Sequence, residues 1–163
     1  MTRRVVITGV GAVTPLGVGA QTLIERWSAG ESGIEDGFGR CLDFEPLDFL
    51  SKKEARRADR FTQMAIAAGK EAIEQAWGEE GELPYDPYRI GCLIATGIGG
   101  LVSLEREQEK LISSGPKAVS PLAVPLMMAN AATAAVSMRH GLQGECYAVA
   151  SACAAGSNGL GDA

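Results

Sequence analysis

The sequence predicts an α/β fold in one domain, because strand-like and helix-like segments alternate along its 163 residues. Short apolar runs at residues 90–95 and 146–150 are typical of buried strands. Longer segments with apolar residues at helical spacing lie between them, and glycines and prolines separate the segments. The composition, with 46% hydrophobic and 21% charged residues, excludes a largely disordered chain.

The first expected elements are a strand at residues 3–8 and a helix at residues 20–28. The Gly9-Val10-Gly11 turn between them is similar to the start of a dinucleotide-binding loop. Thr14 occupies the place of that loop's third glycine, and Pro15 breaks the helix that should receive the phosphates. We therefore do not expect a nucleotide site, and we expect residues 30–50 to form an irregular connection.

The middle of the chain predicts a long helix at residues 59–77, which Gly78 ends. Its apolar positions recur every three or four residues: Phe61, Met64, Ala65, Ala68, Ala72, Ile73 and Ala76. The strand at 90–95 follows, and a glycine-rich loop leads to a helix at 101–113. A further helix is expected from Pro125, a residue that suits a first helical turn, to about residue 139. The glycine-rich loop is expected to let another part of the backbone approach closely.

Cys153 is the most informative residue of the sequence. It follows the predicted strand at 146–150 and precedes a run of small residues that contains three glycines. A thiol at the start of a helix is favoured as a thiolate, which is the nucleophilic form. Because glycine is a poor helix former, this segment is expected to be buried with neighbouring backbone packed closely against it. The alternative is that Cys153 is a small core hydrophobe.

The run Ala150-Ser151-Ala152-Cys153-Ala154-Ala155-Gly156-Ser157 resembles the active-site segment of the β-ketoacyl-acyl carrier protein synthases. Residues 3–17, 89–101 and 119–130 also resemble segments of this family, in the same order and spacing. The likeness is greatest to the type II elongating synthases. It implies a thiolase-like layered α-β-α fold, of which this chain holds the N-terminal half only.

The resemblance also implies a reaction. Cys153 is expected to accept an acyl group as a thioester, and the carbanion formed by decarboxylation of malonyl-acyl carrier protein then attacks it in fatty acid elongation. The backbone N–H of Cys153 is expected to be one oxyanion donor, while Ile98 and Ala152 are expected to line the acyl pocket. The family's two active-site histidines follow the nucleophile, beyond this sequence. No cofactor is implied, and the full-length enzyme is expected to be a homodimer.

The net charge of −5 argues against nucleic acid as the main partner. A capping box that Ser51 opens starts a short helix, and Lys53, Arg56 and Arg57 share one face of it with Arg60. By itself this pattern favours a solvated helix face with some ion pairs over a docking surface. The resemblance favours docking of an acidic acyl carrier protein, and we assign that role to Lys53, Arg56 and Arg57 only.

Other site types are not expected. The four cysteines fit no zinc spacing, and the single histidine, His140, is expected to end a helix and not to act as a base. Met127, Met128 and Met138 are expected in the core or an interface. The sequence has no export signal and no apolar run long enough to cross a bilayer, so we expect a cytoplasmic protein with reduced thiols and no membrane contact.

We expect residues 1–163 to be one N-terminal synthase domain that is truncated within the helix after Cys153, because that helix has only about ten residues and no capping residue. This fragment is expected to be inactive alone. Two alternatives remain open: a non-catalytic, chain-length-type partner subunit of a polyketide synthase, and a non-decarboxylating thiolase-like acyltransferase.

Overall fold

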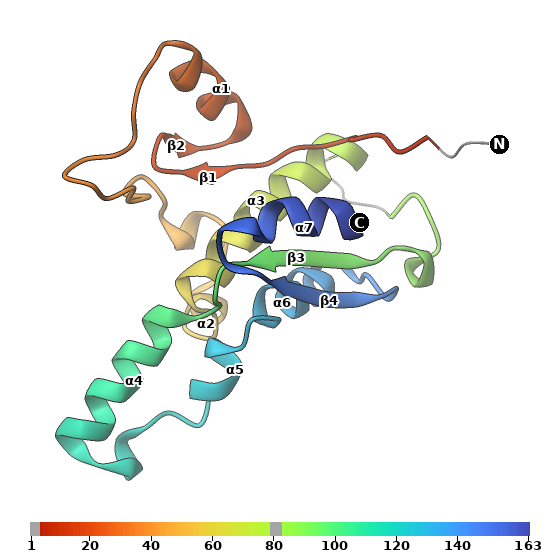
Figure 1. The fold of residues 1–163 in the computed structure, drawn as a ribbon. Coiled ribbons are helices and arrows are strands. Elements are labelled where there is room, and N and C mark those ends of the chain that lie inside the picture. Colours follow the sequence, from red (N-terminus) through yellow and green to blue (C-terminus); the bar gives the residue numbers. More distant parts are fainter. Residues whose placement is uncertain (1–3, 79–82) are drawn as a thin grey trace.

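The computed structural model describes residues 4–78 and 83–163, and its centre is a two-stranded parallel sheet between helices (Figure 1). β3 (Cys92–Thr96) pairs with β4 (Cys146–Ala150), with Cys92 opposite Cys146 and Thr96 opposite Ala150. α7 (Ala155–Asp162) packs on one face of the sheet and α6 (Ala131–His140) on the other, with α3 (Arg60–Trp77) behind α6. The layered α-β-α order that the resemblance implied is confirmed.

The remaining elements surround this centre. They are β1 (Val13–Thr14), β2 (Gly17–Val18), α1 (Ala20–Ser28), α2 (Lys52–Ala55), α4 (Leu101–Ser114) and α5 (Ala123–Met127), with short 3-10 turns η1 (Pro46–Asp48), η2 (Pro87–Arg89), η3 (Pro116–Ala118) and η4 (Ala152–Ala154). Within the described residues, no helix combines the length and the apolar character that crossing a membrane requires.

The long helix α3 begins and ends within one residue of its predicted bounds. The Asp59 carboxylate caps it by accepting a hydrogen bond from the Phe61 N–H at 3.2 Å, and Gly78 ends it with φ of +89°. The second carboxylate oxygen of Asp59 accepts a hydrogen bond from the Ser103 N–H at 2.7 Å. This buried carboxylate therefore also fixes the start of α4 against the start of α3.

The predicted strand at residues 3–8 is wrong for the residues that the structure describes, since residues 4–8 form no strand and Arg3 lies outside the described part. The extended segment that follows lies along α3. A Cβ added to Gly9 would lie 2.0 Å from the Ala72 carbonyl oxygen. The N–H groups of Val10 and Ala12 donate to the side chains of Gln75 and Glu71 at 2.6 and 2.8 Å. Side chains of a helix therefore take the hydrogen bonds that a neighbouring strand would have made.

The single helix expected at residues 125–139 is also wrong, because the chain forms α5 and α6 with a break at Met128, whose ψ is +137°. The glycine-rich loop after β3 accounts for the break. The Gly100 N–H donates to the Met127 carbonyl at 3.1 Å, and a Cβ at Gly100 would lie 2.2 Å from the Leu126 carbonyl oxygen. The expected close backbone approach at this loop is thus confirmed, and it occurs at the end of α5.

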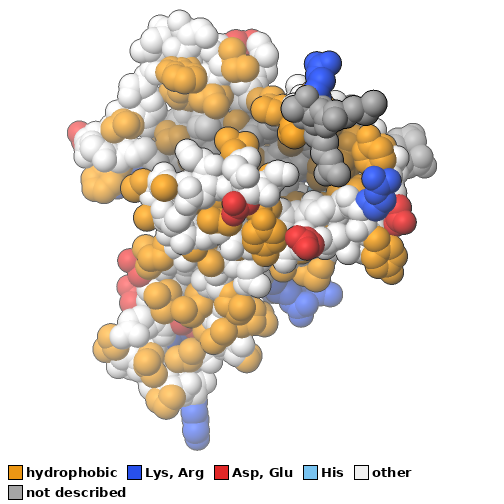
Figure 2. All heavy atoms as spheres, turned by 45° about the vertical axis from the view of Figure 1, so that its right-hand side comes forward, with side chains coloured by type: hydrophobic (Ala, Val, Ile, Leu, Met, Phe, Trp, Pro, Cys, Tyr) orange, Lys and Arg blue, Asp and Glu red, His pale blue; other side chains and the backbone are white. Residues whose placement is uncertain are grey.

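The core lies between α3, α6 and the sheet and consists of Leu50, Ile66, Cys92, Val136 and Leu142. Many large apolar side chains remain outside it. Figure 2 shows hydrophobic side chains gathered over the lower part of the molecule, where α4 and α5 lie in Figure 1. Met138 is 77% exposed, so it does not lie in the core, and the other expected place, an interface, stays a prediction.

Candidate active site

Cys153 lies in the turn η4, between the end of β4 and the start of α7. The predicted order of strand, turn and helix is therefore present, with the cysteine in the turn just before the helix. The residue is exposed and its thiol is free. Cys153 is consequently not a small core residue.

The backbone of this turn adopts a costly conformation. Ala152 has φ of +51°, in the left-handed region that costs an L-residue roughly 1–2 kcal/mol. Such conformations persist where the surrounding structure enforces them, and they are concentrated at functional sites. The turn is tied to α7 by the Asn158 amide, which donates to Ser151 Oγ at 2.8 Å. The sequence held no signal for this feature, because alanine does not mark a positive φ.

α7 packs closely on the sheet at one position. A Cβ added to Gly159 would lie 2.8 Å from Ala95 Cβ and 3.2 Å from Leu93 Cδ2 in β3, so only glycine allows this approach. Gly156 and Gly161 have open space at the corresponding position. The expected burial of the small-residue segment is wrong for most of it, since only Ala155 and Gly159 of α7 are buried. The expected close packing is confirmed at Gly159 and wrong at Gly156 and Gly161.

The two acyl-pocket candidates lie at the same edge of the sheet as Cys153. Thr96 and Ala150 are paired at the carboxyl ends of β3 and β4, so the segments after both strands meet there. A Cβ on Gly97 would lie 4.0 Å from the Ala152 carbonyl oxygen. Ile98, the next residue, is 66% exposed. The structure therefore brings Ile98, Ala152 and Cys153 to the edge at which ligands bind in parallel α/β sheets.

The other cysteines differ from Cys153. Burial raises the pKa of the Cys92 thiol to about 11, with a smaller contribution from Cys146, and burial also raises the pKa of Cys41. Those two thiols are therefore protonated near neutral pH. Cys146 is exposed but begins β4, at the end of the strand opposite Cys153.

His140 also lies at that opposite end. It is the last residue of α6, and β4 separates it from Cys153 by roughly 13 Å of extended chain. Burial lowers its pKa, and its Nε2 atom is buried without a hydrogen-bond partner among the described residues. This placement agrees with the expectation that His140 is not the base for Cys153.

The predicted docking residues lie on a separate element. Lys53 belongs to α2, and Arg56 and Arg57 follow it directly; all three are exposed. The predicted capping box is confirmed, since the Ser51 N–H donates to Glu54 Oε2 at 2.8 Å and the Glu54 N–H donates to Ser51 Oγ at 3.3 Å. These bonds to Ser51, together with Arg139, hold the pKa of Glu54 below its ordinary value.

Arg60 was predicted to share this face, but it has a structural role. It donates to the carbonyls of Cys41 and Phe44 at 2.9 and 3.1 Å, and its guanidinium lies 4.7 Å from the centre of the Phe44 ring. Arg60 thus anchors the irregular connection to the start of α3. The docking assignment, which left Arg60 out, is compatible with this arrangement.

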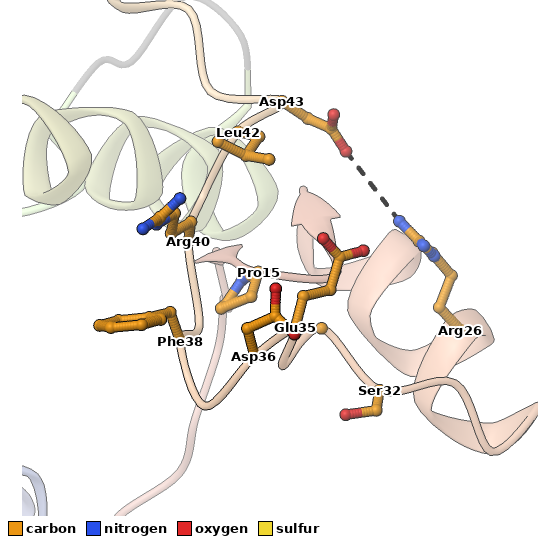
Figure 3. A pocket seen from close by; sticks show the side chains of 10 residues that line it. Pro15, Arg26, Ser32, Glu35, Asp36, Phe38, Arg40, Leu42 and Asp43 are labelled. Carbon is orange, nitrogen blue, oxygen red and sulfur yellow. Dashed lines mark ion pairs between the residues drawn. The ribbon is translucent and has the colours of Figure 1, made fainter.

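Three cavities in the described part of the chain lie away from Cys153. None of them is lined by Cys153, Ile98 or Ala152. One of about 380 Å³ lies between α1 and the irregular connection. Figure 3 shows Glu35 and Asp36 in it, between Arg40 and Arg26, with Arg26 Nη1 4.0 Å from Asp43 Oδ2. The other two adjoin each other beside α2, α3 and α6, with volumes of about 400 and 200 Å³.

Comparison with known proteins relates this geometry to a family. The model of the beta-ketoacyl synthase N-terminal domain matches residues 37–163. The 3-oxoacyl-[acyl-carrier-protein] synthase 2 of Synechocystis sp. is 40% identical, over 99% of this chain and 41% of its own length. The enzyme of the same name from Staphylococcus aureus strain COL is 39% identical over the same shares. The chain therefore spans about two fifths of the length of these curated relatives.

Solved structures have the same fold. The ishigamide ketosynthase/chain length factor superposes with a TM-score of 0.80 at 22% identity, over 96% of this chain and 47% of that one. The structure of a type II polyketide synthase acyl carrier protein in complex with its ketosynthase gives a TM-score of 0.76 at 22% sequence identity, over 97% of this chain and 44% of that one. A beta-ketoacyl synthase from Burkholderia phymatum gives a TM-score of 0.70 at 26% sequence identity, over 99% of this chain and 43% of that one. With the family model matching most of its length, this chain belongs to the beta-ketoacyl synthases, and its fold is that of the N-terminal portion of the thiolase-like ketosynthases.

Proposed function

We propose that Cys153 is the nucleophile of a decarboxylating condensation in fatty acid elongation. The thiolate attacks the thioester of an acyl carrier protein, takes the acyl group and releases the carrier's thiol. Malonyl-acyl carrier protein then loses carbon dioxide, and the resulting carbanion attacks the acyl-Cys153 thioester. The carbon–sulfur bond breaks, Cys153 leaves as a thiolate, and the 3-oxoacyl product remains on the carrier.

The placement of Cys153 supports this proposal more than any other observation. Its exposed thiol lies at the carboxyl edge of the parallel strands, in the turn η4 that leads directly into α7, and it follows the strained Ala152. The positive end of α7 favours negative charge there, both on the thiolate and on an oxyanion. We assign one oxyanion donor to the Cys153 N–H and the near wall of the acyl pocket to Ile98 and Ala152. The names of the curated relatives agree with this reaction.

We also propose that Lys53, Arg56 and Arg57 dock the acyl carrier protein. These cations project from an acidic chain, and charge of this kind steers an acidic partner. The ketosynthase complex with a carrier protein, which shares the fold, makes such a partner reasonable. We further expect a cytoplasmic homodimer of the longer enzyme.

Residues 1–163 are, in this proposal, the N-terminal part of that enzyme and do not complete the condensation alone. The curated relatives are more than twice as long as the matched region, which supports this view. The two histidines that assist decarboxylation, and the second oxyanion donor, would come from sequence after the nucleophile.

The test is acylation of the protein by acyl-carrier thioester, followed by mass spectrometry. We expect the acyl group on Cys153, with its loss in Cys153→Ser and its retention in Cys146→Ser, the matched change at another exposed cysteine. Equal acylation of Cys146, or alkylation of Cys153 by iodoacetamide no faster than that of an ordinary buried thiol, would contradict the role of Cys153 and favour the non-catalytic partner subunit.

A second assay separates the two enzymatic possibilities. The longer enzyme should form 3-oxoacyl product with malonyl-acyl carrier protein as the extender. Product formed from acetyl-coenzyme A in its place would indicate the non-decarboxylating thiolase-like reaction.

A further inference from the structure

The larger of the two adjoining cavities, which we call the α2 hollow, has an apolar floor and a basic rim. Leu50, Ile66 and Ala135 form the floor, Met138 lies at the mouth, and Lys53, Arg57 and Arg139 surround it. The volume of the hollow is about 400 Å³. Met138 and Arg139 come from α6, and no local pattern groups them with the cations that follow Ser51. The fold therefore adds an apolar surface and one more cation to the predicted docking residues.

The rim keeps an excess of positive charge. Glu54 is its one acidic residue among those that line the hollow, and Arg139 offsets that charge, with Nη1 3.2 Å from Glu54 Oε1. The other Arg139 nitrogen, Nη2, donates to the Phe49 carbonyl at 2.9 Å, which fixes the guanidinium in place. Among the described residues, Lys53, Arg56 and Arg57 form no ion pair, so their charges remain available to a partner.

The depth of the hollow suits a side chain that projects from a larger molecule. Leu50 and Ile66 at its base are buried, whereas Met138 at its mouth is 77% exposed. Pockets for small ligands enclose most of the ligand's surface, and this open site does not. The adjoining cavity of about 200 Å³ shares Arg57 and Met138 with it. Its lining includes Thr62, whose buried hydroxyl has no hydrogen-bond partner among the described residues.

We propose that the α2 hollow receives an apolar side chain of the acidic acyl carrier protein, and that Met138 and Arg139 are docking residues together with Lys53, Arg56 and Arg57. The inference rests on the proposed function, because the occupant is the carrier that delivers the acyl group. Charge complementarity selects this occupant, because the acidic carrier protein complements a rim of cations, and the apolar floor can receive an apolar side chain of that partner. In such interfaces the charges accelerate encounter, and the buried apolar contact slows dissociation.

The test measures the dissociation constant of acyl carrier protein for the protein and for single variants, at two salt concentrations. Met138→Ser should weaken binding about 5- to 10-fold with an unchanged salt dependence, because it removes an apolar contact and no charge. Met138→Leu should bind within about twofold of the unmodified protein. Tyr88→Ser, a matched change at a side chain that is 74% exposed and does not line the hollow, should leave binding unchanged.

Lys53→Glu supplies the arm that tests the proposed docking itself. It should weaken binding and flatten the salt dependence, since it reverses a rim charge. If Lys53→Glu weakens binding and Met138→Ser does not, the hollow is not part of the interface and the inference is wrong, while the proposed docking stands. If neither variant weakens binding, docking on this surface is wrong as well.

A third arm tests a different occupant. In this experiment octanoate is added to the protein and the Met138 methyl resonance is followed by NMR. If octanoate shifts this resonance while Met138→Ser leaves the affinity for the carrier unchanged, the hollow binds a small amphiphile and the inference is wrong. Because Met138 is exposed, the fold should tolerate its substitution, and circular dichroism of each variant checks this.

Discussion

At the scale of single residues, the candidate site depends on an alanine whose backbone is held in an unfavourable conformation. Ser151, Ala152 and Cys153 must turn the chain from β4 into α7 within a few residues, and the positive φ of Ala152 is part of that turn. The side chain of Asn158 holds the same turn from within the helix. Cys153 is thus presented by strained backbone that two neighbouring elements hold in place.

Substitution at Ala152 should measure this strain. Ala152→Gly should raise the free energy of unfolding by up to about 1 kcal/mol, because glycine adopts a positive φ without steric cost. Ala152→Val should lower it by more than 1 kcal/mol, since a branched side chain is least tolerated there. Ala155→Gly, in α7 at φ of −54°, is the control and should destabilise by roughly 0.5–1 kcal/mol. Urea unfolding gives all three values, and a loss of stability in Ala152→Gly would contradict the account.

His140 should make stability depend on pH. Burial, and then Arg139, lowers its pKa from the ordinary value of 6.5, so the unfolded chain binds this proton more readily than the folded one. Above about pH 6.5 His140 is neutral in both states, and the free energy of unfolding is unaffected by its titration. As pH falls below that value the unfolded chain takes up the proton first, so the free energy of unfolding decreases. The carboxylates with lowered pKa values, Glu54 and Glu107, lose their contributions only below their ordinary value of 4.5.

The window between pH 7 and pH 5 thus isolates the histidine. Urea midpoints of the unmodified chain should decrease over this window, and those of His140→Asn should change much less. Identical pH profiles would show that His140 does not carry the effect.

At the scale of elements, α7 approaches β3 through a single glycine. Gly159→Ala should destabilise the protein by roughly 1–3 kcal/mol, because the new methyl group would lie 2.8 Å from Ala95 Cβ and would push the helix off the sheet. Gly156→Ala, in the same helix with nothing within 4 Å, should instead stabilise it by up to about 1 kcal/mol through helix propensity. Thermal melts of both variants check this, and a shared direction of change would contradict it.

Elements that depend on local signals could be predicted from the sequence, and elements that depend on distant partners could not. α1, α3 and β4 have strong periodicity or clear caps and lie at or within one residue of their expected bounds. The segment at 3–8 has strand composition, but the backbone beyond it bonds to α3 side chains. The break after α5 depends on a loop some 25 residues earlier, which no local pattern near Pro125 could indicate.

The candidate site shows the same division. Cys153 and the cations after Ser51 could be located because short motifs mark them. The strain at Ala152 and the grouping of Met138 and Arg139 with Lys53 could not, since each arises from the way separate elements meet.

At the scale of the whole molecule, buried and half-buried carboxylates connect segments that the sheet does not reach. Glu71 of α3 accepts hydrogen bonds from the N–H groups of Ala12 and Ala20, both at 2.8 Å. Glu107 of α4 accepts from Lys110 Nζ at 2.8 Å and from the Ser120 N–H at 2.7 Å, and the bond from Lys110 is the main reason that its pKa is lowered. Together with Asp59, these residues hold the peripheral helices and loops around a small core.

The core leaves a large apolar surface uncovered, above all over α4 and α5. Val102, Ile112 and Val124 are 56%, 76% and 61% exposed. Figure 2 shows hydrophobic side chains gathered over the part of the molecule where α4 and α5 lie. Apolar patches of this kind are unusual on monomers and mark contact surfaces. The 163-residue chain should therefore self-associate at micromolar concentrations and bind the dye anilinonaphthalene sulfonate.

Charges placed on this surface should reverse the association. The double variant Ile112→Glu and Val124→Glu should raise the concentration needed for association tenfold or more, because each lost apolar contact is worth about 1.5–3 kcal/mol when fully buried. Tyr88→Glu, an equally exposed site on η2, is the control and should leave the association unchanged. Sedimentation velocity measures the effect. Two outcomes would show that α4 and α5 do not form the contact surface. One is an unmodified chain that is still monomeric at about 100 µM, roughly a hundredfold above the concentration at which we expect association. The other is a Tyr88→Glu control whose association is weakened as much as that of the double variant.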